Sequence, residues 1–379
     1  MIAIKNAELI MHDHMIPDAV LFVEDGKIKG FGEARLTPIP AGCEVIDAEG
    51  AYVAPGMVDI HTHSGNGKYF YEDVKKVSRH FLDHGTTTVL AALYYDMNCE
   101  KYLEAIKTVT DAMLTPDCPN LCGIYMEGPY LNPKFGCNRE KNPWKGPIDQ
   151  KDYDRLIAAC GDAVYVWGCA PERENIEAFV KAAKAAKPSV RFSVAHSEAT
   201  PEQIEALMPY GLCIGTHHTN ATGTLPAPPE CRSVCVDETV NYHHDIYAEI
   251  ICDSRGIHVH PYMQRLVRRI KGDDRIILIS DAFAADGPTP PGYEGVTDIN
   301  FDHAGEIAGS NLTLEVACRN MMRHTGASLV DVFNYASYNP ARAIGMLDRG
   351  EIAVGKRADL VFVDCKVNVK KVMLGGVMQ

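Results

Sequence analysis

Eight short, predominantly apolar runs recur along the middle of the chain, each four to six residues long. Runs of that length, bounded by turn signals, predict β-strands that are buried on both faces. They are Met57–His61, Thr88–Leu93, Cys122–Met126, Val164–Trp167, Arg191–Ala195, Leu212–Gly215, Ala248–Cys252 and Ile276–Ser280.

Amphipathic segments with helical spacing of their apolar residues lie between successive strands. They are Glu72–His84, Tyr102–Leu114, Lys151–Cys160, Ile176–Ala186, Pro201–Tyr210 and Pro261–Lys271. A strand followed by a helix, repeated around eight strands, is the pattern of a (β/α)8 barrel. A Gly- and Pro-rich segment, Asp286–Gly309, follows the eighth strand and is long enough to form a lid or an excursion over the barrel mouth.

The two ends of the chain share a β-rich pattern. Near the start, two strand-like runs flank a hairpin signal at Asp25-Gly26, and two more runs, Ala358–Asp364 and Val369–Leu374, lie near the end. The predicted fold class is therefore α/β, a (β/α)8 TIM-like barrel with a small β-sandwich domain formed by both termini. We expect residues 1–52 plus 348–379 to form the small domain and residues 53–347 to form the barrel, a metal-dependent hydrolase domain on the reasoning below.

Composition narrows the class of protein. Of the 379 residues, 46% are hydrophobic and 23% are charged, as in a globular protein with a sizeable core. No apolar run approaches the roughly 18–20 residues needed to cross a bilayer, and the start lacks the order of a signal peptide. The 13 cysteines are scattered and odd in number, which suits reduced thiols. We expect a cytoplasmic protein without a membrane segment, and the net charge of −13 argues against a nucleic-acid partner.

Candidate chemistry begins at the end of the first strand, where His61 and His63 point the same way because side chains alternate along a strand. Such a pair in isolation is more often two ordinary polar residues than a metal site. Further ligands are found where a barrel needs them, since its chemistry lies at the carboxyl ends of the strands. Those ends carry Glu127 after strand three, His196 after strand five, His217 after strand six and Asp281 after strand eight.

Imidazole and carboxylate ligands together suit Zn²⁺, Fe²⁺, Mn²⁺ or Co²⁺, and a carboxylate can bridge two ions. The pattern therefore predicts one or two divalent ions per chain, without distinguishing among these metals. Such a centre activates water for attack on a carbonyl. Asp281 is placed to take the proton from that water and return it to a leaving nitrogen.

These motifs as a set resemble the amidohydrolase superfamily and, within it, the family of N-acetylglucosamine-6-phosphate deacetylases. The resemblance covers essentially the whole chain. It rests on residues 55–63 (PGMVDIHTH), 126–131 (MEGPYL), 170–172 (APE), 195–200 (AHSEAT), 216–221 (THHTNA), 256–259 (GIHV), 280–282 (SDA), 309–313 (GSNLT), 336–341 (ASYNPA) and 350–360 (GEIAVGKRADL).

The resemblance implies a role for each matching residue. Glu127, His196 and His217 would hold one metal, His61 and His63 a second where it is present, and Asp281 would be the catalytic acid and base. His258 resembles the substrate-orienting histidine of the family, and Asn220 and Ala221 resemble its sugar-phosphate contact. A homodimer is implied in the same way.

The chain departs from the family in its substrate contacts. Where the family has a substrate histidine after strand three, this chain has Asn138, and where the family carries a phosphate-binding arginine segment, the nearest candidate is Arg232. The reaction we predict is removal of the N-acetyl group from an amino-sugar phosphate, giving glucosamine-6-phosphate and acetate from N-acetylglucosamine-6-phosphate. Two alternatives remain open. One is another amidohydrolase reaction at the same centre, on a different N-acylated sugar, an N-acylated amino acid or a cyclic amide, and the other is a non-catalytic homologue.

Overall fold

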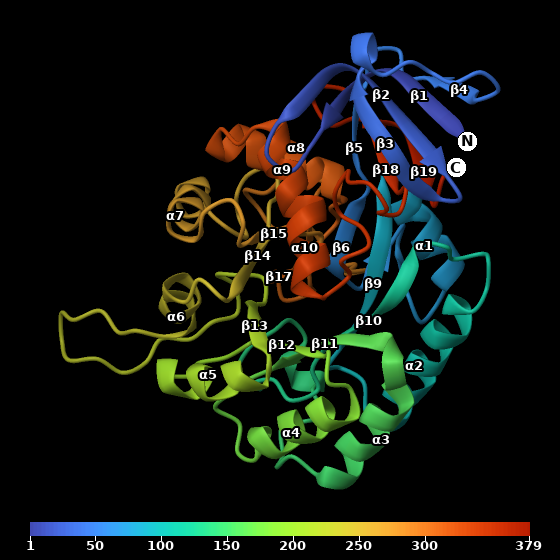
Figure 1. Ribbon diagram of the computed structural model, residues 1–379. Coiled ribbons are helices and arrows are strands. Elements are labelled where there is room, and N and C mark those ends of the chain that lie inside the picture. Colours follow the sequence, from blue (N-terminus) through green and yellow to red (C-terminus); the bar gives the residue numbers. More distant parts are fainter.

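A sheet of eight parallel strands forms the centre of the computed structural model, which describes residues 1–379. The sheet has the order β15-β14-β13-β12-β11-β10-β9-β6 and curves into a nearly closed barrel (Figure 1). Its strands are β6 (Met57–Thr62), β9 (Thr86–Tyr94), β10 (Leu121–Glu127), β11 (Val164–Cys169), β12 (Arg191–Val194), β13 (Leu212–Gly215), β14 (Tyr247–Ile251) and β15 (Ile276–Ile279). The predicted barrel is confirmed, and each predicted strand agrees with the observed one to within two residues at either end.

Helices cover the outside of the barrel (Figure 1). They are α1 (Val74–Asp83), α2 (Cys99–Met113), α3 (Gln150–Cys160), α4 (Ile176–Ala186), α5 (Pro201–Leu207), α6 (Val236–Tyr242), α7 (Pro261–Lys271), α8 (Leu314–Thr325), α9 (Leu329–Phe333) and α10 (Asn339–Ala343), with a π-helix at Asn334–Tyr338 between the last two. The sequence did not predict α6, whose seven residues follow a long irregular segment after β13. Its start is nevertheless encoded locally, since the Cys235 amide donates to Glu238 Oε2 at 3.1 Å. No helix has the length and apolar character required to cross a bilayer.

The first and last strands of the barrel are joined at the carboxyl end rather than along a ladder. The backbone N–H of Asp281 donates to the carbonyl of His61 at 3.0 Å, and that of His63 donates to the carbonyl of Ala282 at 3.0 Å. These bonds lie at the carboxyl end of β6 and just beyond β15, so the seam of the barrel is closed at the residues predicted to carry chemistry.

Both termini contribute to a second, separate sheet, as predicted. Its order is β20-β19-β18-β5-β1-β2-β3, with β4 also paired to β1. The strands are β1 (Ile2–Ile10), β2 (Met15–Glu24), β3 (Lys27–Glu33), β4 (Glu44–Asp47), β5 (Tyr52–Pro55), β18 (Leu360–Val363), β19 (Val369–Leu374) and β20 (Val377–Met378). The predicted domain boundary between residues 52 and 53 falls inside β5, whose antiparallel partner is β18.

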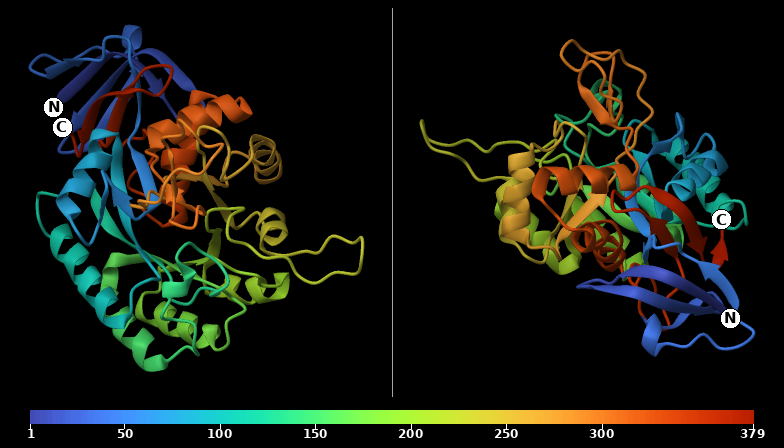
Figure 2. Two further views of the ribbon diagram at one scale, coloured as in Figure 1. Left: turned by 180° about the vertical axis from the view of Figure 1, so that it is seen from behind. Right: turned by 90° about the horizontal axis from the view of Figure 1, so that it is seen from above.

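The segment 286–309, predicted as a loop, contains a hairpin that projects from the barrel (orange in Figure 2). Its strands are β16 (Ile299–Phe301) and β17 (Ile307–Ser310). The start of the segment passes so close to the hairpin that a Cβ at Gly287 would lie 2.2 Å from the carbonyl oxygen of Asp302. Two strands of three and four residues, among many Gly and Pro, are too short for their alternation to be recognised in the sequence.

Candidate metal centre and active site

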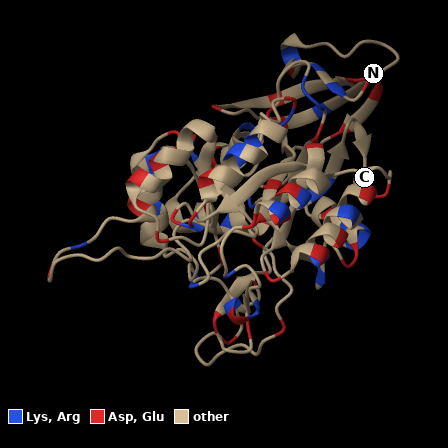
Figure 3. Cartoon of the chain, turned by 90° about the horizontal axis from the view of Figure 1, so that it is seen from below, with Lys and Arg blue, Asp and Glu red and all other residues tan.

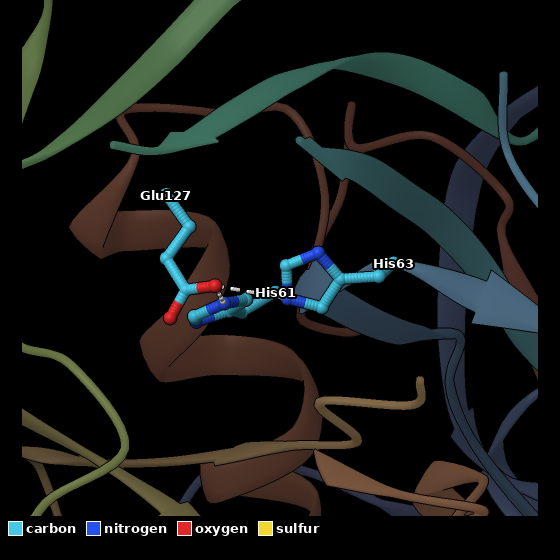
Figure 4. A group of neighbouring side chains, drawn as sticks. All are labelled: His61, His63 and Glu127. Atoms are coloured by element: carbon cyan, nitrogen blue, oxygen red, sulfur yellow. Dashed lines mark ion pairs between the residues drawn. The ribbon is translucent and has the colours of Figure 1, made fainter. Parts of the chain in front are cut away.

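Six predicted side chains converge at the carboxyl end of the barrel, and all six residues are buried. β6 supplies His61 and, one residue beyond its end, His63; β10 ends on Glu127; and His196, His217 and Asp281 follow β12, β13 and β15. The alternation of side chains along β6 directs both histidines toward Glu127 (Figure 4).

Glu127 is shared by two groups of ligand atoms. Its Oε1 lies 2.8 Å from His196 Nε2 and 3.1 Å from His217 Nε2. Its Oε2 lies 3.1 Å from His63 Nε2 and 3.7 Å from His61 Nε2. The two groups, His61–His63–Glu127 and Glu127–His196–His217, therefore meet at one carboxylate, which is the arrangement by which a glutamate bridges two ions.

The donor atoms fit a divalent ion. Metal–nitrogen bonds of about 2.0–2.1 Å in tetrahedral geometry separate neighbouring ligand atoms by about 3.3 Å, close to the spacing around Glu127 Oε1. The Nε2 of His61 is buried and has no hydrogen-bond partner. A buried imidazole nitrogen left without a partner is costly, and coordination of an ion would satisfy it.

Three of these residues adopt a backbone conformation that non-glycine residues rarely use. The φ angles of His196, His217 and Asp281 are 44°, 28° and 46°. Each lies just after the end of its strand, where a left-handed residue turns the chain and re-aims the side chain. Strain of this kind persists where the surrounding structure over-determines it, and it clusters at functional sites.

Glu249 on β14 is a site residue that the sequence reasoning missed. It is fully buried, and its Oε2 lies 3.0 Å from His61 Nδ1 and accepts the backbone N–H of His217 at 3.2 Å. It therefore fixes one histidine of each ligand group. A carboxylate within the apolar run 248–252 was the available signal, because a charged side chain is rarely buried in a strand unless it has a partner.

The carboxylates of Glu127 and Asp281 and one histidine of the site are held in the protonation state that their predicted roles need. Burial raises the pKa of Glu127, but the imidazoles of His61, His196 and His217 outweigh burial and hold the pKa of that carboxyl well below its usual range. Burial also lowers the pKa of His196, which favours the neutral form that a metal requires. For Asp281, burial raises the pKa while His63, whose Nε2 lies 3.2 Å from Oδ1, lowers it, and the net direction is downward. Asp281 is therefore ionised near neutral pH and able to accept a proton.

A cavity of about 320 Å³ opens above these ligands. His258, Asn220 and Ala221, three of the predicted substrate contacts, line it. Asp253 positions His258, because its Oδ2 lies 3.1 Å from His258 Nδ1 and accepts the backbone N–H of the same residue at 2.8 Å. The other ring nitrogen, Nε2, has no partner, so it remains available to a bound molecule.

Asn138 and Arg232, the other two predicted substrate contacts, lie outside that cavity. Asn138 lines a neighbouring surface pocket, whereas the residue after it, Arg139, lines the central cavity. Arg232 lies on the long segment that projects beside α6 (Figure 1); its side chain is 85% exposed and pairs with Glu238 at 2.9 Å. Both assignments remain predictions.

A parallel barrel with two histidine–glutamate groups at its carboxyl end and an ionised aspartate beside them defines the class of metal-dependent barrel hydrolases. Comparison with known proteins gives the family. The amidohydrolase family matches residues 52–378, and the chain belongs to it.

Two relatives and one solved structure make the similarity more specific. The chain is 28% identical to the N-acetylglucosamine-6-phosphate deacetylase of Bacillus subtilis (strain 168), over 96% of this chain and 94% of the relative. It is 27% identical to the N-acetylgalactosamine-6-phosphate deacetylase of Escherichia coli O157:H7, over 98% of both. The structure of the N-acetyl-D-glucosamine-6-phosphate deacetylase of Mycobacterium smegmatis, a mutant in complex with N-acetyl-D-glucosamine-6-phosphate, superposes with a TM-score of 0.83 at 27% identity, over 100% of this chain and 98% of that one.

Proposed function

We propose that this protein is a metal-dependent deacetylase that hydrolyses the N-acetyl group of an amino-sugar 6-phosphate, with N-acetylglucosamine-6-phosphate as the first candidate substrate. The observation that carries the proposal is the joining of the two ligand groups through Glu127, beside Asp281, at the floor of one cavity. The similarity to deacetylases over nearly the whole chain supports it. N-acetylgalactosamine-6-phosphate is the second candidate, because one of these relatives is named for it.

In this proposal Glu127, His196 and His217 hold one ion and His61 and His63, with Glu127, hold a second. When bound, a divalent ion at these ligands supplies a Lewis acid for the acetyl carbonyl and activates water at neutral pH. Asp281 takes the proton from the attacking water and then gives it to the amide nitrogen. The C–N bond breaks, acetic acid and the neutral amine leave, and the acid then loses its proton to solvent to give acetate. His258, held by Asp253 through Nδ1, presents its free Nε2 to the substrate and orients it.

Measurement of acetate release tests the function directly. The metal-loaded protein is supplied with N-acetylglucosamine, N-acetylgalactosamine and their 6-phosphates, and an N-acetylated amino acid and a cyclic amide serve as controls for the alternative amidohydrolase reactions. We expect acetate from the phosphorylated sugars at the highest kcat/KM. Turnover of only the amino acid or the cyclic amide would contradict the proposal.

We also propose that the enzyme is a cytoplasmic homodimer. All 13 cysteines are free, which suits a reducing compartment. A groove of about 550 Å³ between α6 and α7 carries exposed apolar side chains, among them Tyr242, Leu266 and Ile270. Contiguous exposed apolar surface of this kind is typical of subunit contacts. Light scattering coupled to size-exclusion chromatography, with Tyr242→Glu as the disrupting variant, measures the subunit number.

A further inference from the structure

The central cavity has two cationic side chains in its lining, Lys134 and Arg139, and both come from the loop that follows β10. Seen from below, acidic and basic positions are interspersed along the chain (Figure 3). The chain carries a net charge of −13. An anionic substrate therefore meets an unfavourable overall field, and its charge has to be compensated locally.

Arg139 is held in place by the backbone around it. The hydroxyl of Tyr95 donates to the carbonyl of Cys137 at 2.8 Å, and that of Tyr94 donates to the same carbonyl at 3.2 Å. Gly136 fits beneath these rings because it lacks a Cβ, which would lie 2.2 Å from the Tyr95 hydroxyl. The loop that presents Arg139 is thus pinned to β9 and to the residue after it.

In this structure Arg139 is paired with a carboxylate from the projecting hairpin. Its Nη1 and Nη2 donate to the two oxygens of Glu306 at 2.7 and 3.0 Å. This is the two-pronged geometry with which a guanidinium binds a carboxylate or a phosphate. Both side chains are nearly half exposed, at 44% and 48%, so the pair contributes little stability and exchanges readily.

We propose that Arg139 binds the anionic group of the substrate from within the same chain and that Glu306 competes with the substrate for Arg139. Lys134, which pairs with Glu198, adds positive charge to the same lining. The inference rests on the proposed function and specifies which residues select the phosphorylated sugar. A phosphate dianion carries more charge than a carboxylate and binds a guanidinium with the same geometry, so it displaces Glu306. The alternative, Arg232, is exposed, pairs with Glu238 and lies outside the cavity.

The hairpin links this exchange to the catalytic aspartate. Ile307 and Gly309, which follow Glu306, also line the cavity. The backbone N–H of Ser310 donates to the carbonyl of Asp281 at 2.9 Å. Glu306 is therefore only four residues before Ser310, whose backbone contacts Asp281, the residue that transfers the proton.

The test compares Arg139→Gln with Arg155→Gln in the metal-loaded enzyme. Arg155 is a matched control, because it is exposed and paired with Glu100 at 2.7 Å but lies on α3, outside the cavity. We expect Arg139→Gln to raise KM for N-acetylglucosamine-6-phosphate by roughly 10- to 100-fold, with little change in kcat/KM for N-acetylglucosamine. Arg155→Gln should change neither. Equal losses on both sugars, or an effect of Arg232→Gln in place of Arg139→Gln, would overturn the inference.

Glu306→Gln gives a change of opposite sign, since removal of the competing carboxylate lowers KM for the phosphorylated sugar; a raised KM would contradict the displacement.

Titration calorimetry with inorganic phosphate separates this inference from the proposed function, because binding needs no turnover. We expect weaker phosphate binding in Arg139→Gln than in wild type and Arg155→Gln. If wild type releases no acetate from any sugar but this binding difference is found, the proposed function fails and the anion site stands; equal binding in all three proteins overturns the anion site.

Discussion

The Nε2 atoms of His196 and His217 lie 3.0 Å apart and face one another at Glu127. Burial lowers the pKa of His196, and although burial acts in the same direction on His217, Glu127 raises the pKa of that ring overall, so without an ion a proton on His217 Nε2 faces His196. A divalent cation takes the place of that proton and meets both nitrogen lone pairs, so the folded protein should bind metal far better than the unfolded chain does.

Metal removal is therefore predicted to destabilise the fold. At a free ion concentration 100-fold above the dissociation constant, binding at one site adds about 2.7 kcal/mol to the free energy of unfolding. Thermal unfolding with and without a chelator, and again after the ion is restored, measures this difference. The double variant His196→Asn/His217→Asn should lose most of the response, and a chelator effect of undiminished size in that variant would place the stabilising ion elsewhere.

Replacement of Asp281 by Asn should abolish turnover while leaving metal content intact. The amide cannot accept the proton of the attacking water, and the loss of a positioned acid–base group costs about 10²- to 10⁴-fold in kcat. Metal analysis by atomic absorption and acetate release on the same preparation give the two values. Near-normal turnover would remove the acid–base assignment.

Glu249→Gln should weaken metal binding by about 10- to 100-fold, the usual effect of losing a charged partner of a ligating histidine. The variant keeps the size of the side chain but removes the charge that faces His61 Nδ1. Glu315→Gln is a matched control, because Glu315 is also buried and lies 2.6 Å from the Nδ1 of a histidine, His84, remote from the site. Competition with a chromogenic chelator compares the affinities, and equal values for both variants would refute a positioning role.

Asp253→Asn should reduce stability in a pH-dependent way. Although burial raises the pKa of Asp253, hydrogen bonds from His258 and nearby backbone amides lower it to about 2, against an ordinary value of 3.8. Because the folded pKa is the lower one, the ionised group contributes about 2 kcal/mol above pH 3.8, and this contribution is lost as pH falls toward 2. Urea unfolding of wild type and variant at pH 6 and at pH 3, both with chelator, measures it. A difference that does not shrink at the lower pH would contradict this origin.

Gly136→Ala should destabilise the protein by about 1–3 kcal/mol, since the added methyl group overlaps the Tyr95 hydroxyl and φ is 94°. The same change at Gly146, where a Cβ would meet nothing within 4 Å, is the control and should be nearly neutral. Chemical denaturation compares the two. Equal stabilities would show that the loop before Arg139 is not fixed by this packing.

The barrel, and the convergence of the predicted ligand residues at its carboxyl end, could be predicted from the sequence because regular alternation fixes both. An apolar run marks each strand, and the residue at its carboxyl end must lie at the mouth of the barrel, which is how Glu127 and Asp281 were located. Glu249 was missed because it lies inside a strand, where spacing gives no reason to look for a ligand. Its partner atoms, on β6 and after β13, meet it only in three dimensions.

Loop residues were harder to place, and Asn138 shows the reason. The family resemblance indicated this position for substrate contact, which remains a prediction; Asn138 lines a neighbouring pocket, and Arg139 lines the central cavity. Asn138 has a φ of 52°, so the chain turns at this residue. In irregular backbone no period relates neighbouring side chains, so the sequence alone does not tell which of two adjacent residues faces the cavity.

The pairing of β5 with β18 has a consequence for synthesis on the ribosome. Val53 lies opposite Phe362 in the terminal sheet, a separation of 309 residues (362 − 53). At about 5–20 residues per second, the edge of β5 emerges roughly 15–60 s before its partner exists. Until translation is nearly finished, the nascent chain therefore presents an unpaired strand edge of the kind that chaperones cover and that neighbouring chains can pair with.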